Sequence, residues 1–122
     1  MTIVLNHTIV PARDKTAAAR FFAEIFGLKC EPVDYFAPVR VNAQMTLLFS
    51  DESTEHESHH YAFHVSDADF DAIFDRIRAA GLTYGSDPSH LDNGKLNTWG
   101  GGRGVYFKDL DGHVLELMTV PQ

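Results

Sequence analysis

Residues 100–119 read GGGRGVYFKDLDGHVLELMT, a pattern that predicts a strand, a tight turn and a second strand. Residues 105–107 are β-branched and aromatic, as half-buried strands prefer. Residues 109–112 read DLDG and supply turn chemistry, with a glycine that can adopt a positive φ. The second strand is apolar except for Glu116, and a carboxylate there is costly to bury unless a cationic group meets it. We therefore expect other parts of the chain to bring such a group to Glu116.

Length and composition indicate a single globular domain over residues 1–122. The chain has 122 residues, of which 44% are hydrophobic and 22% charged, as is typical of domains with a core. Its net charge of −7 argues against nucleic acid or an anionic membrane as a partner. No apolar run approaches the ~20 residues of a membrane span. Cys30 is the only cysteine and residues 2–5 show no signal-peptide pattern, so we expect a cytoplasmic protein.

The first half of the chain predicts a strand, a helix and three short strands. Alternation over residues 2–10 is typical of a strand. Asp14 is a suitable N-cap for a helix that ends near Phe26, and Gly27 suits the left-handed position that follows. The short strands are expected near residues 28–32, 35–41 and 45–49. A polar, exposed connection is expected over residues 51–58.

The second half predicts the same kinds of element. The expected bounds are a strand from about residue 59, a helix over 69–80 and a short strand over 82–85. Asp67 is the expected N-cap of the helix, and Gly81 is expected to end it. Residues 86–99 form the longest irregular segment, and we hypothesise that it is a lid with Trp99 over the site.

Several features recur at matching positions in the two halves. His7 and Asp14 are seven positions apart, as are His60 and Asp67, and each pair opens a strand followed by a helix. The two halves therefore predict tandem βαβββ modules, which is an α+β arrangement. The modules span about residues 2–50 and 59–120.

The repeat places two histidines at equivalent positions. If the modules are equivalent, His7 and His60 lie on the first strand of each, and Glu116 lies on the last strand of the second. Two imidazoles and one carboxylate form a facial triad, which holds a divalent metal and leaves positions open for water, oxygen or a chelating substrate. A single strand histidine is more often a packing or edge residue, and Glu116 alone can face solvent. Because His7 and His60 occupy matching positions in the two halves, we favour a shared metal site over a packing role for each histidine and a solvent-facing Glu116.

Three further residues are candidates for roles near this site. His64 shares a strand face with His60, so it can carry a proton, orient a ligand or simply pack. Tyr106 can donate from its phenol to a substrate oxygen, or it can be an ordinary strand aromatic. Arg103 can pair with an anionic substrate or lie on the surface.

The chain resembles the vicinal oxygen chelate superfamily, also called the glyoxalase/bleomycin resistance/dioxygenase family. The segments that carry the resemblance are Leu5-Asn6-His7, FFAEIFGL at 21–28, HYAFHV at 60–65 and VYFKDLDGHVLE at 105–116. The resemblance covers nearly the whole chain. It implies that the two βαβββ modules form a cupped, half-open mixed β-sheet with the helices outside.

The resemblance also implies site residues and a cofactor. The superfamily's three-ligand pattern falls on His7, His60 and Glu116, and a substrate-contacting tyrosine falls on Tyr106. These residues imply a divalent metal ion, with Fe²⁺ or Mn²⁺ favoured and Zn²⁺ or Ni²⁺ as alternatives. Members of this size are typically homodimers.

The expected function is metal-dependent chemistry on a small substrate that chelates the metal through two oxygens. Dioxygenase-like chemistry is the first choice, because the triad of two histidines and a glutamate resembles that of ring-cleaving dioxygenases. Glyoxalase-like lyase or isomerase chemistry is the second, because residues 44–49 lack the additional glutamate ligand that the resemblance to glyoxalase I would imply. The alternative is a bleomycin-resistance-type protein that sequesters a small aromatic drug or metabolite without turnover. A metal-free interaction module is a third possibility.

Overall fold

A computed structural model describes all residues of the chain, 1–122. The chain divides into two compact units, Met1–Glu57 and Ser58–Gln122, and each is described here by itself. The boundary falls inside the polar connection expected over residues 51–58. No helix in the structure is long and apolar enough to cross a membrane.

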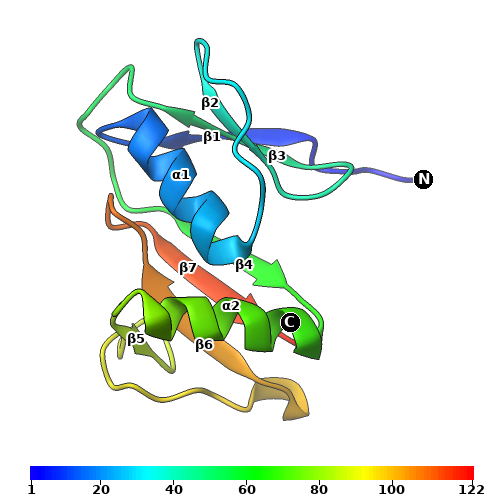
Figure 1. Cartoon of the computed structure of the whole chain (residues 1–122). Helices are drawn as coiled ribbons and strands as arrows, with labels where there is room; N and C mark the ends of the chain where they lie inside the picture. Colours follow the sequence, from blue (N-terminus) through cyan, green and yellow to red (C-terminus); the bar gives the residue numbers. More distant parts are fainter. The chain divides into compact units, whose positions relative to one another are not determined.

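The first unit contains three strands and one helix (Figure 1). Its elements are β1 (His7–Pro11), α1 (Lys15–Phe26), β2 (Ala37–Arg40) and β3 (Thr46–Ser50). The strand order is β1-β3-β2, with β1 parallel and β2 antiparallel to β3. The sheet is therefore mixed, as the α+β expectation requires.

Helix α1 begins and ends where its sequence predicts. The Asp14 side chain accepts a hydrogen bond from the backbone N–H of Ala17 at 3.0 Å, and Gly27 takes the left-handed conformation with φ 71°. The helix packs its apolar face on β2 and β3. Phe22 is buried in this contact, with its ring 6.0 Å from that of Phe49 in β3.

Two expectations for the first unit are wrong. No strand forms over residues 28–32, so this unit has one strand fewer than the predicted module. The chain here turns toward the start of α1, where the Lys15 ammonium donates to two backbone carbonyl oxygens, those of Asp34 and Tyr35, at 2.7 and 2.9 Å. The first strand begins at His7 rather than at Thr2, because its partner β3 begins at Thr46.

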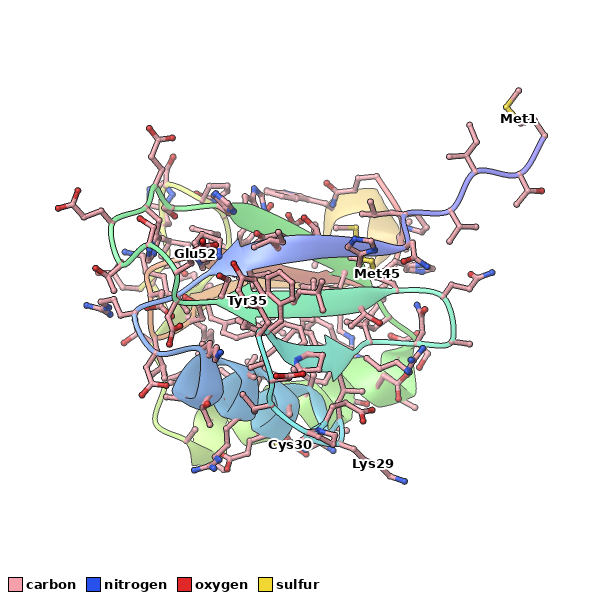
Figure 2. The ribbon with its side chains drawn as sticks, turned by 90° about the horizontal axis from the view of Figure 1, so that it is seen from above. Met1, Lys29, Cys30, Tyr35, Met45 and Glu52 are labelled. Atoms are coloured by element: carbon pink, nitrogen blue, oxygen red, sulfur yellow. The ribbon has the colours of Figure 1, made fainter.

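Figure 2 shows the loop between α1 and β2 in the first unit. The Tyr35 hydroxyl donates to a carboxylate oxygen of Glu52 at 2.8 Å, and this bond raises the pKa of the phenol. Cys30 is exposed beside Lys29. The loop is thus tied to both the helix and the connection that follows β3.

The second unit has the full predicted set of elements. These are β4 (His60–His64), α2 (Asp67–Ala79), β5 (Tyr84–Gly85), the short 3₁₀ turn η1 (Trp99–Gly101), β6 (Gly104–Lys108) and β7 (Val114–Met118). The strand order is β4-β7-β6-β5, with β4 parallel to β7 and the other pairs antiparallel. Figure 1 shows α2 lying over this sheet.

The C-terminal hairpin of β6 and β7 forms as residues 100–119 predict. A carboxylate oxygen of Asp109 accepts from the backbone N–H groups of Asp111 and His113, both at 2.9 Å. Gly112 has φ 80°, which a residue with a side chain rarely adopts. The hairpin turn is therefore fixed by its own sequence.

Two boundaries in the second unit differ from the expected ones. The N-cap of α2 is Ser66 rather than Asp67, because the Ser66 hydroxyl accepts from the backbone N–H of Asp69 at 3.1 Å. The strand expected over residues 82–85 is reduced to β5, which holds only two residues.

The two faces of the second sheet differ in character. One face is fully buried and apolar, formed by Val105, Phe107, Leu115 and Leu117. Tyr84 belongs to this face, because its ring meets that of Phe74 in α2 edge to face at 5.0 Å. The opposite face carries Glu116, Tyr106 and the histidines of β4, and the candidate metal-binding residues of the second unit lie on it.

Candidate metal centre

Strand register brings four residues into one row across the second sheet. Glu116 is paired with Ala62 on one side and with Tyr106 on the other, and Tyr106 is paired in turn with Gly85. Because alternate residues of a strand point to opposite faces, His60 lies on the same face as Ala62. The row therefore contains a carboxylate and a phenol, and the imidazole of His60 lies on the same face two residues before Ala62.

His60 and Glu116 are in direct contact. The Nε2 atom of His60 lies 2.9 Å from Oε1 of Glu116, and the two side chains are 46% and 5% exposed. The imidazole N–H donates to the carboxylate in this arrangement. The partner that residues 100–119 require for a buried carboxylate is thus a histidine from a strand 56 positions earlier.

Tyr106 is the second partner of Glu116. Burial raises the pKa of the Tyr106 phenol, and its hydrogen bond to the Glu116 carboxylate raises that pKa further. The phenol therefore keeps its proton and donates to the carboxylate. Its ring lies 5.7 Å from that of His60 and meets the ring of Trp99 edge to face at 6.0 Å.

The chemistry of these donors fits a divalent metal ion. Metal–nitrogen and metal–oxygen bonds of about 2.1 Å that meet at a right angle place the two donor atoms about 3 Å apart. The 2.9 Å between His60 Nε2 and Glu116 Oε1 is a hydrogen-bond distance that lies close to that separation, and Nε2 would have to lose its proton before both atoms could bind a metal. In neither unit do three or more His, Cys, Asp or Glu side chains gather to hold a metal by themselves. The structure therefore supplies two of the three predicted donors side by side.

His7 is the predicted third donor, and the structure describes it within the first unit. It is exposed at the start of β1, and its Nδ1 atom lies 2.7 Å from the amide oxygen of Asn6. When Nδ1–H donates to that oxygen, Nε2 keeps a free lone pair, which is the usual state of a metal-binding imidazole. A ligand role for His7 remains a prediction.

His64 lies on the same face of β4 as His60. Its Nε2–H donates to the backbone carbonyl of Thr119 at 3.2 Å. This bond fits the packing role that the sequence leaves open, and a role in proton transfer remains a prediction.

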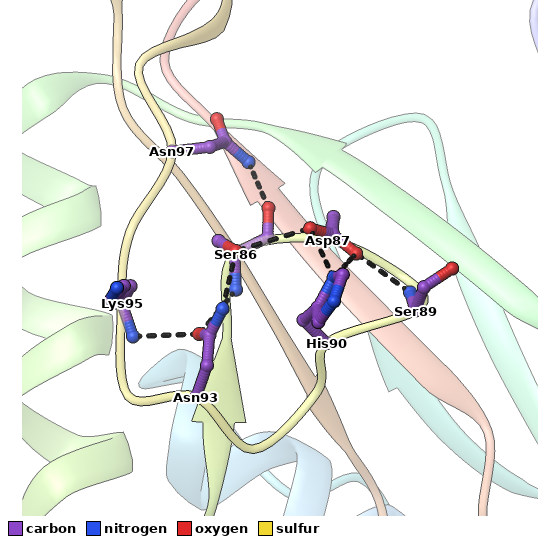
Figure 3. A network of polar contacts seen from close by, with 7 residues as sticks. All are labelled: Ser86, Asp87, Ser89, His90, Asn93, Lys95 and Asn97. Carbon is purple, nitrogen blue, oxygen red and sulfur yellow. Dashed lines mark hydrogen bonds and ion pairs between the residues drawn. The ribbon is translucent and has the colours of Figure 1, made fainter.

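An aspartate that the sequence reading missed also acts on this face. The Asp87 carboxylate accepts from Nδ1–H of His90 at 2.8 and 2.9 Å and from the backbone N–H of Ser89 at 2.9 Å (Figure 3). The bond from His90 is the main reason that the pKa of Asp87 is lowered, and the negative charge of Asp87 helps to raise the pKa of Tyr106. The pattern Asp-Pro-Ser at 87–89 is a turn signal that marks this position.

The segment 86–99 is held by hydrogen bonds of its own (Figure 3). Asn97 donates to the backbone carbonyl of Ser86 at 2.8 Å, and Asn93 donates to the Ser86 hydroxyl at 2.8 Å. The Trp99 ring contacts that of Tyr106 edge to face, and a position of the indole over the site remains a prediction. Motion of the segment as a lid remains a prediction.

Arg103 is engaged away from the Glu116 face. Its guanidinium pairs with the carboxylates of Asp67 and Asp71 at 3.0 and 2.6 Å and lies over the ring of Phe70. These contacts support the surface role rather than the pairing with an anionic substrate.

The sequence over residues 4–117 matches the family described as the Glyoxalase/Bleomycin resistance protein/Dioxygenase superfamily. The chain belongs to this superfamily. The expected resemblance and the α+β fold class are thus confirmed. Members of the superfamily are generally dependent on divalent metals, in agreement with the paired donors at Glu116.

Two solved structures of the superfamily are similar over nearly the whole chain. The protein named oxidase ChaP-H2 is 51% identical, with a TM-score of 0.93 over 99% of this chain and 96% of its own. The protein named oxidase ChaP-H1 is 48% identical, with a TM-score of 0.92 over 98% of each chain. At this level of identity, the chain is similar to the two proteins in sequence as well as in fold.

More distant superfamily members bear other names. The fosfomycin resistance protein FosX of Mesorhizobium loti has a TM-score of 0.72 over 99% of this chain and 95% of its own, and at 24% identity it shows the fold alone. A curated FosX from Mesorhizobium japonicum is 31% identical over 75 residues, which are 62% of this chain. The chain spans about half the length of this curated relative.

Proposed function

We propose that this protein is a divalent-metal-dependent oxidase that acts on a small substrate able to bind the metal through two oxygens. The observation that carries the proposal is the 2.9 Å contact between His60 and the buried carboxylate of Glu116. The 51% identity with the protein named oxidase ChaP-H2 supports oxygen chemistry over lyase or isomerase chemistry. We further propose a cytoplasmic homodimer, following the sequence expectations.

The metal ligands in this proposal are His60, Glu116 and, as the third, His7. Fe²⁺ or Mn²⁺ is favoured, since either suits a site of two imidazoles and one carboxylate. Such an ion, when bound, supplies a positive centre for two substrate oxygens and a place for oxygen to react. The carboxylate of Glu116 offsets part of the metal's charge, and the neutral imidazoles leave the remainder available to an anionic substrate.

Tyr106 is proposed to orient the substrate. Its phenol stays protonated because burial and the Glu116 carboxylate both raise its pKa. It therefore acts as a hydrogen-bond donor rather than as a base. A proton acceptor must come from another group, and His64 on the same sheet face is our candidate.

Metal analysis of protein purified without oxygen tests this proposal. We expect about one equivalent of Fe or Mn in the wild type and its loss in Glu116→Gln. Glu52→Gln is the matched control, because Glu52 is an exposed carboxylate that also accepts from a tyrosine. Oxygen consumption with catechol should then require both the metal and Glu116.

Two results would contradict the proposal. If the wild-type protein binds no metal after reconstitution with Fe, Mn, Zn and Ni, the proposed metal site is refuted. Tight binding of an aromatic drug by that empty protein, without turnover, would support the sequestration alternative. Occupancy by Zn or Ni with no oxygen consumption would leave a metal enzyme but refute the oxidase assignment.

A further inference from the structure

We propose that a cavity of about 410 Å³ in the second unit, lined in part by Lys108 at the end of β6, holds the body of the substrate, and that Lys108 binds an anionic oxygen of that substrate. The lining residues are Thr83, Pro88, Ser89, Leu91, Asp92 and Lys108, all in the second unit. The inference rests on the proposed function for the identity of the ligand as substrate. It adds the ligand's chemical class, a ring compound that carries a carboxylate or phenolate.

Strand geometry places the cavity on the same sheet face as Glu116. Lys108 follows Tyr106 by two residues in β6, so its side chain points to the same face about 7 Å further along the strand. On the neighbouring strand, Tyr84 is turned toward α2, so the Cβ position of Gly85 is on the opposite face, which is that of Glu116, and there it meets the backbone of His90. A ligand in the cavity would thus lie on the face of the sheet that carries Glu116 and Tyr106, although neither of these two residues lines the cavity itself.

The outer wall of the cavity is prebuilt. It is formed by residues 88–92, which the bonds of Asp87 with His90 and Ser89 hold in place. The backbone of this wall sits directly on Gly85, where a Cβ atom would lie only 1.7 Å from the carbonyl oxygen of His90. A wall held this firmly lowers the entropy cost of ligand binding.

The lining indicates the ligand's chemistry. A volume of about 410 Å³ lies within the range of small-molecule sites, roughly 300–1,000 Å³. Pro88 and Leu91 offer apolar surface to a ring, while Ser89 and Thr83 offer hydroxyl groups. Lys108 is exposed and forms no ion pair, so its ammonium is available to an anion.

Asp92, the one anionic residue that lines the cavity, limits the chemical class of the ligand further. Asp92 faces the same cavity as Lys108, and its carboxylate accepts hydrogen bonds but repels a second negative charge. The cavity therefore favours a ligand with one anionic group and a hydroxyl over a dianion. An ortho-hydroxynaphthoate has this composition, and naphthol is the matched compound without the carboxylate.

The test is a titration of metal-free protein, kept in chelator, with ortho-hydroxynaphthoate and with naphthol, followed by amide chemical shifts and calorimetry. We expect Lys108→Met to weaken hydroxynaphthoate about tenfold or more, as the loss of a charge-assisted hydrogen bond predicts. Naphthol binding should change less than about threefold, and Lys108→Arg should retain the carboxylate preference. Lys95→Met is the control, because Lys95 is exposed on the same segment but does not line the cavity.

The outcomes separate this inference from the proposed function. Equal binding of hydroxynaphthoate by wild type and Lys108→Met would overturn the inference, as would shifts confined to residues outside 83–92 and 104–108. Absence of binding by the wild type would also overturn it. If Lys108-dependent binding persists in Glu116→Gln while the wild type takes up no metal, the cavity assignment stands and the proposed function fails.

Discussion

Glu116 and Asp109 are two carboxylates of one hairpin that are partnered in different ways. Glu116 receives hydrogen bonds from two side chains, His60 and Tyr106. Asp109 receives them from backbone N–H groups in the turn, yet burial still raises its pKa. Its ionised form is therefore less favourable in the folded state than in the unfolded chain.

This pKa shift gives a prediction for Asp109→Asn. A folded-state pKa above the unfolded value means that stability is highest below the unfolded pKa and falls as pH rises through the folded pKa. The amide oxygen of Asn keeps the acceptor for the turn but carries no charge. We expect the variant to be at least as stable as wild type at neutral pH. In the wild type, the ionisation of Asp109 lowers the free energy of unfolding as pH rises above 3.8, and the variant should lack this contribution. Urea denaturation at several pH values measures it, and an unchanged pH slope would contradict the assignment.

At this scale the sequence could predict a partner for Glu116, because a carboxylate in an apolar strand requires one. It could not single out Asp87, since that residue lies in a polar segment like many surface aspartates. Its influence on Tyr106 depends on how the segment folds back over the sheet. His64 and Thr119 are likewise joined only by the pairing of distant strands.

β5 shows how a short element can be fixed by what packs on it. The strand has only two residues, and one of them, Gly85, lies under the backbone of His90 and Leu91. A side chain at this position would push the segment 86–99 away from the sheet. The glycine therefore determines where the cavity wall lies.

Gly85→Ala is expected to destabilise the protein by about 1–3 kcal/mol or more, because backbone atoms rather than flexible side chains must move. Gly94→Ala is the matched control on the same segment. Gly94 has φ 66° and open space around it, so only backbone strain of about 1 kcal/mol is expected. Chemical denaturation compares the two, and equal losses would show that the packing on Gly85 does not matter.

Helices were easier to predict than strands in this chain. The caps of α1 are local signals, and both Asp14 and Gly27 act as their residue types suggest. The strand expected over residues 28–32 fails because a strand needs a neighbour, which local sequence does not reveal. Instead of strand-to-strand hydrogen bonds, the loop after α1 receives hydrogen bonds from the Lys15 ammonium at the carbonyl oxygens of Asp34 and Tyr35.

At the level of the whole molecule, the internal repeat is real but unequal. Each unit pairs its first strand in parallel with its last, as β1 with β3 and β4 with β7. The second unit adds β5 and the long segment after it, which provides the cavity wall. The repeat in sequence therefore predicted the shared parts and could not predict where the halves differ.

The connection between the units should be the first point of proteolysis. Asp51 is held in the first unit by the backbone N–H of Lys15, and the Ser58 hydroxyl donates to the carbonyl of Gly112 in the second. Glu55 and Glu57 lie between these anchors, exposed and outside any helix or strand. A glutamate-specific protease should cut there before Glu24 in α1, and mass spectrometry of early fragments checks the order. Earlier cleavage at Glu24 would contradict the described boundary.

The parallel pairing of β4 with β7 also sets the order in which the protein can form as it is made. β4 lies at the edge of its sheet, and its only strand partner comes 54 positions later, from His60 to Val114. At a synthesis rate of roughly 5–20 residues per second, β4 would wait about 3–10 s on the ribosome with an unpaired aromatic edge. The contact between His60 and Glu116 is consequently among the last that the newborn chain can make.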